Sequence, residues 1–135
     1  MALPNIVAPE FTTILPSSET EIKFRPFLVK EEKLLLFAAE SGERNDMINA
    51  VCQMMRNCVI SPEDLEPTNI PYFDFEYLLL HIRAKSVGET AEFMLKHDKE
   101  ECGQENKVST RLDNIIYKTN DDHTDKIQLN DELGV

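Results

Sequence analysis

Glycine is scarce in this sequence, with four residues among 135. Neither of the glycine-rich patterns that cradle phosphate groups, GxGxxG and GxxxxGKS or GxxxxGKT, occurs. Both depend on glycine because the backbone has to approach the phosphate oxygens closely. None of the serines stands in the GxSxG pattern that presents a nucleophilic serine on a sharp turn. The sequence therefore indicates neither a nucleotide-binding loop nor a hydrolase of that kind.

Positive charge is also in short supply, because 14 Lys and Arg stand against 25 Asp and Glu, giving a formal net charge of −11. Nucleic acid and anionic lipid attract basic patches that release counterions, and no such patch is visible. We therefore expect no nucleic-acid partner and instead expect basic or neutral protein surfaces as partners. No apolar run reaches the length of a membrane span, and the N-terminus lacks the basic start of a secretory signal. We expect a soluble protein without a membrane partner.

Cysteine occurs three times, as Cys52, Cys58 and Cys102. The number is odd, and the first two lie within an apolar helical pattern. This usage favours reduced thiols in a reducing compartment over a disulfide framework.

The stretch EECGQENKV, residues 100–108, places Cys102 before a glycine and between two alternating patterns, as in half of a zinc ribbon. Such a site needs four nitrogen or sulfur ligands, usually from paired cysteine knuckles. Lys99 occupies the position three residues before Cys102, where a second cysteine would stand. Cys102 is thus one candidate ligand, with His97 and His123 as distant helpers, but the number of ligands falls short and we predict no metal. We predict a hairpin turn in which Gly103 supplies a positive φ and Asn106 assists.

Residues 1–20, rich in Pro, Ser and Thr, predict an extended N-terminal arm. Two interpretations remain open: the arm wraps its own domain, or it is buried against a partner or neighbouring subunit. The candidate partner-binding residues are Ile6, Val7, Phe11, Ile14 and Leu15 in the arm, with Phe24 and Arg25 just after it.

Residues 21–88 predict a mainly helical core. EIKFRPF, residues 21–27, predicts a short edge strand because Pro26 removes a ladder donor. Helical spacing predicts helices over 29–41, 43–60 and 71–88, with a helical turn in the link between the last two. The methionines of the second helix, Met47, Met54 and Met55, indicate either an adaptable groove or plain core. In the third helix the row Phe73, Tyr77, Leu80 and Ala84 is expected to face inward. Leu78, Leu79 and Ile82 are expected to widen this buried arc.

Residues 89–135 predict an antiparallel β-meander that forms one compact unit with the core. The runs 89–97 and 106–114 alternate, and 125–131 offers a third strand. A packed face is expected from Phe93, Leu95, Val108 and Leu112. The fold class is therefore α+β: an extended arm and a short edge strand, a three-helix half, then a β-meander resembling a degenerate zinc ribbon.

Catalytic chemistry finds little support in the 25 acidic residues. Adjacent acids such as Glu31 and Glu32, or Glu63 and Asp64, do not face each other on a helix and are solvated in loops. A useful general acid needs its pKa moved by a desolvating site. His81 lies on an apolar helix and is interpreted as a core or boundary side chain. We predict no catalytic residue and no cofactor, and therefore no enzyme.

The stretch IKFRPFLVKEEKLLLFAAES, Ile22 to Ser41, resembles the N-terminal signature of the baseplate hub and hub-assembly proteins of T-even-like contractile-tailed bacteriophages. LPNIVAPEFTTILPSS is similar to their extended leader, and CVISPEDLEPTNIPYFDFEYLLLHIRAKSVGE follows in the same order. In such relatives the hairpin often reads CxxCG, so Lys99 and Cys102 mark a knuckle that kept its turn and lost its ligands. The resemblance also implies relatives that continue past the equivalent of residue 135.

The resemblance implies a phage tail protein without catalysis, whose partners are other baseplate hub or tail proteins. It also implies a possible homo-oligomer, as a trimer around the tail axis, located in the virion tail baseplate and in the host cytoplasm during assembly. Two functions remain open. One is a structural component of the hub, and the other is a transient cytosolic assembly chaperone for hub or tape-measure protein.

Overall fold

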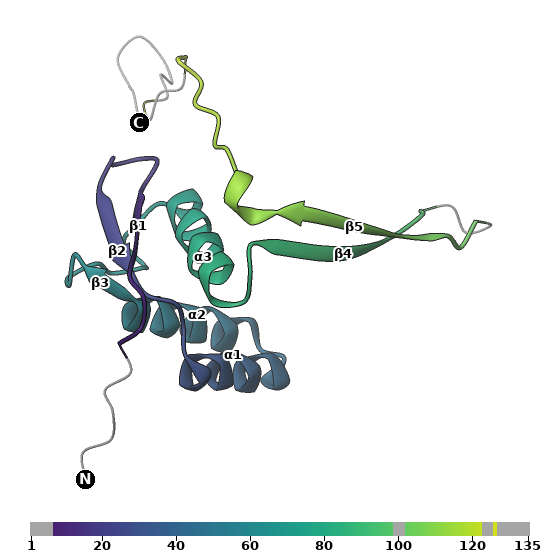
Figure 1. The fold of residues 1–135 in the computed structure, drawn as a ribbon, viewed down its shortest axis with the longest axis horizontal. Helices are drawn as coiled ribbons and strands as arrows, with labels where there is room; N and C mark the ends of the chain where they lie inside the picture. Colours follow the sequence, from purple (N-terminus) through teal and green to yellow (C-terminus); the bar gives the residue numbers. More distant parts are fainter. Residues whose placement is uncertain (1–6, 99–101, 123–125, 127–135) are drawn as a thin grey trace.

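The computed structural model describes residues 7–98, 102–122 and 126, and within them it has an α+β fold with three α-helices and two small antiparallel sheets (Figure 1). The elements in chain order are β1 (Phe11–Ile14), β2 (Glu21–Phe24), α1 (Val29–Ser41), α2 (Arg44–Cys58), β3 (Val59–Ser61), α3 (Tyr72–Ser86), β4 (Thr90–Lys96), β5 (Glu105–Arg111) and the 3₁₀ helix η1 (Leu112–Asn114).

The first sheet has the order β1-β2-β3, so β2 is its central strand. The prediction of an edge strand at this position was wrong. Pro26 lies beyond the last residue of β2, so its missing N–H removes no bond from the ladder, and the N–H of Arg25 still donates to the carbonyl of Cys58 at 2.9 Å. β1, which pairs with β2 from Phe11 opposite Phe24 to Ile14 opposite Glu21, belongs to the segment expected as an arm.

The helices begin and end close to the predicted positions. α1 matches residues 29–41, because strong helix formers fill it and Gly42 ends it with φ 71°. α2 ends at Cys58 rather than at residue 60, and the two β-branched residues that follow, Val59 and Ile60, enter β3. The link from residue 62 to 71 contains turns in place of the expected helical turn. One of them is closed by the bond from the N–H of Leu65 to the carbonyl of Pro62.

The main core lies where the first sheet packs on α2 and α3. Its buried members are Leu15, Ile22, Phe24, Met54, Met55, Cys58, Leu78 and Ile82. Two of the three methionines of α2 are thus plain core. α3 turns the row Asp74, Leu78 and Ile82 inward at four-residue spacing, whereas Phe73, which was expected inward, is more than half exposed.

The second sheet is the β4–β5 hairpin, which extends away from the helical body (Figure 1). Only its base is buried, where Ala91 and Leu112 pack with Ala84 and Leu80 of α3. Of the four residues expected to form a packed face, Leu112 is buried. The prediction is wrong for Phe93, Leu95 and Val108, which are 52%, 56% and 40% exposed. No second layer covers them among the described residues.

The turn of this hairpin contains Gly103 with φ 53°, as predicted. Asn106 does not assist the turn, because it pairs with Leu95 inside the ladder. The third strand expected over 125–131 lies, apart from Lys126, outside the described residues. Over the part that is described, the region is a two-stranded hairpin, and its likeness to a zinc ribbon remains a prediction.

Candidate functional site

The predicted partner-binding residues separate into two groups. Phe11, Leu15 and Phe24 pack into the protein's own core, with the rings of Phe11 and Phe24 6.0 Å apart between centroids. The ammonium group of Lys85 on α3 lies 5.3 Å from the centre of the Phe11 ring. From Phe11 to Leu15, the segment expected as an arm therefore wraps its own domain.

The remaining candidates lie nearer the surface. Val7 and Ile14 are exposed, and Ile6 lies outside the described residues. Arg25 keeps 17% of its side chain exposed, and its guanidinium donates to the carbonyl of Pro26 at 2.9 Å and to Glu31 at 3.2 Å. Partner binding by these residues stays a prediction.

A buried carboxylate, Asp74 on α3, attaches the turn after β1 to the helix. The backbone N–H of Ser17 donates to Asp74 Oδ1 at 3.2 Å, and the Ser17 hydroxyl donates to Oδ2. Asp74 has no exposed surface. A buried carboxylate is costly unless its oxygens accept hydrogen bonds, so this pair fixes the turn on α3.

A second buried carboxylate, Glu31, lies in the first turn of α1. It accepts hydrogen bonds from the backbone N–H of Leu28 at 2.8 Å, from Arg25, and from Asn57 of α2 at 3.4 Å. Burial alone raises the pKa of the Glu31 carboxyl, but the Leu28 N–H and the Arg25 guanidinium outweigh burial and hold that pKa below its usual value. Glu31 is therefore a charged anchor that joins α1, α2 and the end of β2.

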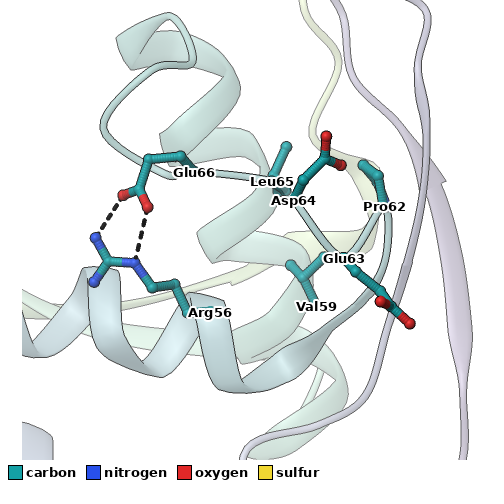
Figure 2. A pocket seen from close by; sticks show the side chains of 7 residues that line it. All are labelled: Arg56, Val59, Pro62, Glu63, Asp64, Leu65 and Glu66. Atoms are coloured by element: carbon teal, nitrogen blue, oxygen red, sulfur yellow. Dashed lines mark hydrogen bonds and ion pairs between the residues drawn. The ribbon is translucent and has the colours of Figure 1, made fainter.

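The adjacent acids Glu63 and Asp64 border a small hollow of about 200 Å³, which is also lined by Arg56 and Glu66. Arg56 donates to both oxygens of Glu66, through Nε at 3.2 Å and through a second, shorter bond. This bond from Arg56 holds the pKa of Glu66 below its ordinary value. Figure 2 shows Glu63 and Asp64 pointing away from the ion pair. Such paired, solvated charges support the link after β3 and do not form a desolvated acid pair.

An apolar groove of about 610 Å³ lies between α2, the end of the link and the first half of α3. Met47, Ile48 and Val51 come from α2, Pro67 and Ile70 from the link, and Tyr72, Phe75 and Leu79 from α3. Among the described lining residues, Arg44 alone is charged. A volume of this size is typical of sites that take a small apolar ligand or the side chains of a partner. Of the methionines named from the sequence, Met47 lines it.

Further large apolar side chains are uncovered on α1 and on the β4–β5 hairpin. Leu36 and Phe37 point outward from α1, and Phe93, Leu95 and Met94 from β4. Of these residues, Phe93 and Leu95 were expected on a packed face, and no placement was predicted for Leu36, Phe37 or Met94. The one available signal was the run LLLFAA, whose apolar residues surround the helix and exceed what one neighbour can cover.

The cysteines and histidines that the structure describes form no ligand set. In the described parts of the chain, no three residues of the types His, Cys, Asp and Glu lie close enough to hold a metal ion. Cys102 is exposed and its Sγ lies 3.9 Å from Gln104 Oε1, whereas Cys52 and Cys58 are buried. His81 is half-buried against the ring of Tyr77, and burial lowers the pKa of its imidazole. His81 is thus a boundary side chain, as predicted.

These features together offer uncovered apolar surface, an apolar groove and charges that are already paired. That combination suits binding to another protein surface. Nowhere in the described residues is a helix long and apolar enough to cross a membrane.

A family described as T4 bacteriophage base plate protein matches residues 8–135. No curated protein and no solved structure matches the chain.

Proposed function

The chain belongs to the T4 bacteriophage base plate protein family, and from this membership we propose that it is a non-enzymatic component of the baseplate hub. The family implies a baseplate protein of the virion tail, in contact with other tail proteins. The proposal adds the hub as its place and protein–protein contact as its only activity. Its neighbours are then hub proteins, and a further copy of the chain is included among them.

The observation that carries the proposal is the amount of large apolar side chain left uncovered on separate elements. Phe37 on α1, Ile48 in the groove and Phe93 on β4 are each about half exposed or more. A soluble monomer seldom exposes large contiguous apolar patches, whereas proteins built into assemblies cover such patches with neighbours. The free edges of the described strands β1 and β3 offer backbone groups to a neighbouring sheet in the same way.

A second function, a transient assembly chaperone for hub or tape-measure protein, is favoured by the groove. The groove is apolar and contains Met47, a flexible side chain that adapts to different partners. The acidic chain, with its net charge of −11, suits a carrier that stays soluble in the host cytoplasm until it releases its cargo.

Purified tails distinguish the two functions. We expect the polypeptide at a fixed copy number per baseplate, measured by quantitative mass spectrometry of tails purified from infected cells. Its absence from finished tails, together with its co-purification with hub or tape-measure protein earlier in infection, would replace the structural role with the chaperone. Absence from both preparations would contradict both functions. Alanine substitution of Glu63 and Asp64, a solvated pair, should leave tail assembly unchanged.

A further inference from the structure

The β4–β5 hairpin has one apolar and one polar face. Cross-strand pairing places Phe93 opposite Val108 and Ala91 opposite Thr110, so these side chains share a face with Leu95. The other face carries charge, and on it Lys107 Nζ lies 2.8 Å from Glu92. A two-stranded ribbon alone is only marginally stable in water, and it gains stability when its apolar face packs on another layer. The described part of the chain supplies such a layer only at the base of the hairpin.

The groove between α2, the link and α3 also lacks an apolar partner, because none of the described residues fills it. The groove and the hairpin lie along different halves of α3: Tyr72, Phe75 and Leu79 line the groove, and the hairpin begins four residues after Ser86. A 15-residue helix is about 22 Å long. The strands also run away from the helical body (Figure 1). A hairpin therefore does not fill the groove of its own chain.

We propose that the apolar face of the β4–β5 hairpin docks in the α2–α3 groove of a second copy of this chain, and that two copies do so reciprocally. The inference rests on the proposed function and names one partner for these surfaces. Phe93, Leu95 and Val108 are the docking side chains, and Ile48 and Phe75 belong to the receiving wall.

Neither surface shares the acidity of the chain, and both carry a small positive excess, so the contact rests on apolar burial and not on charge. The two strands contain Glu92 and Glu105 against Lys96, Lys107 and Arg111, and so carry one positive charge in excess. The groove lining adds only the positive charge of Arg44. Because the hairpin projects from the body, it carries its apolar face to the second copy while the acidic surfaces stay apart.

Area explains why the exchange is reciprocal. Seven residues per strand give a ribbon about 24 Å long and about 10 Å wide. One face then removes about 500 Å² from water, counting both partners, which is less than specific interfaces bury. Two equivalent dockings around a twofold axis bury about 1,000 Å², which reaches the lower limit for a specific contact. The expected dimer is therefore concentration-dependent.

The test is the mass of the purified full chain, measured by sedimentation over a concentration series. We expect a monomer–dimer equilibrium. Phe93→Asp on the docking face and Ile48→Asp in the groove should each raise the dissociation constant about tenfold or more, because each buries a charge at the contact. Met94→Asp on the polar face and Leu36→Asp on α1 add the same charge elsewhere and should leave the constant unchanged. Circular dichroism checks that all four variants keep the helical fold.

Cys102 offers a direct readout, because it is the exposed cysteine near the tip of the hairpin. A photo-crosslinker on its thiol, in a mixture of isotope-labelled and unlabelled copies, should attach to α2, α3 or the link of the other copy. Crosslinks between two hairpins, a ring of three or more copies, or a monomer at every concentration would overturn the inference. If the protein is a monomer in solution yet present in purified tails, the inference fails and the proposed function stands.

Discussion

Ser17 and Asp74, 57 positions apart in the sequence, are joined by two hydrogen bonds that both end on the carboxylate of Asp74. One bond comes from the backbone N–H of Ser17 and the other from its hydroxyl. The contact attaches the first β-hairpin to α3, and it explains why the N-terminal segment is ordered against the protein's own body from residue 11 onward.

Replacing Ser17 by alanine removes the hydroxyl and leaves the buried carboxylate with one donor. We expect a loss of about 1–3 kcal/mol in the free energy of unfolding, measured in urea, because an unsatisfied buried acceptor keeps its desolvation cost. Ser18→Ala is the matched control, since Ser18 is exposed like Ser17 but the bonds to Asp74 come from Ser17, and it should change the stability by less than about 0.5 kcal/mol. Equal stabilities for the two variants would show that the Ser17 hydroxyl bond contributes nothing.

Leu15 and Ile14 test how far the N-terminal segment belongs to the core. Leu15 is 2% exposed and Ile14 is 54% exposed, although they are neighbours in the chain. Leu15→Ala should cost about 2–5 kcal/mol of stability through lost burial and a residual cavity, whereas Ile14→Ala should cost far less. The comparison is made by thermal and urea unfolding of the two variants. A small effect at Leu15 would mean that this segment is not part of the core in solution.

Glu31 gives the protein a pH-dependent contribution to stability. Its pKa is lower in the folded protein than in the unfolded chain, so its stabilisation is complete above the unfolded pKa of about 4.3 and is lost as the pH falls through the lower folded value. Glu31→Gln should cost about 1–3 kcal/mol at pH 7, because the buried carboxylate loses its charged hydrogen bonds.

The measurement is the free energy of unfolding of wild type and Glu31→Gln between pH 7 and pH 3, and the difference should shrink toward the acid end. Glu32→Gln, at the exposed neighbouring position of the same helical turn, is the control and should follow the wild-type curve. A difference that is constant with pH would contradict a role for the charge of Glu31.

The cysteines should differ sharply in reactivity. Burial raises the pKa of the Cys58 thiol to about 11, and Cys52 of α2 is buried as well. A thiol reagent at pH 8 should therefore modify Cys102 rapidly in the native protein and all three cysteines in denaturant. Cys102→Ser should remove the rapid phase. Rapid modification in that variant would show that α2 opens readily.

Metal content is a separate expectation for the hairpin turn. Elemental analysis of the purified protein should find no stoichiometric zinc, and Cys102→Ser should leave the melting temperature nearly unchanged, because Cys102 is an exposed turn residue. One zinc per chain, lost in the Cys102→Ser variant, would establish a metal site that includes residues outside the described ones.

The helices were the predictable part of this fold. A run of strong helix formers followed by Gly42 locates α1 to the residue, and α2 and α3 end within two residues of the prediction at each terminus. β1 was missed because its apolar residues, Phe11 and Ile14, stand three positions apart and do not alternate, and β3 was missed because three residues are too few to show a period of two. β3 also depends on pairing with β2 from across the α1–α2 hairpin, which no local pattern reveals.

The candidate site was less predictable for a related reason. Alternation in the sequence shows that Phe93, Leu95 and Val108 share a face, but it does not say whether another layer covers that face. The groove likewise combines Met47, Ile70 and Phe75 from three separate segments, and such a long-range combination follows only from the packed structure. The family resemblance stated from Ile22 to Ser41 agrees with the match over residues 8–135.

Pairing of β2 with β3 closes the chain around the α1–α2 hairpin, because one strand leads into α1 and the other leaves α2. The two helices cannot separate from the body as an independent flap while that ladder remains intact. The amide hydrogens in the inner turns of both helices and in the β2–β3 ladder should therefore exchange together, as one cooperative unit. Those of the projecting β4–β5 ribbon should exchange earlier, through local opening.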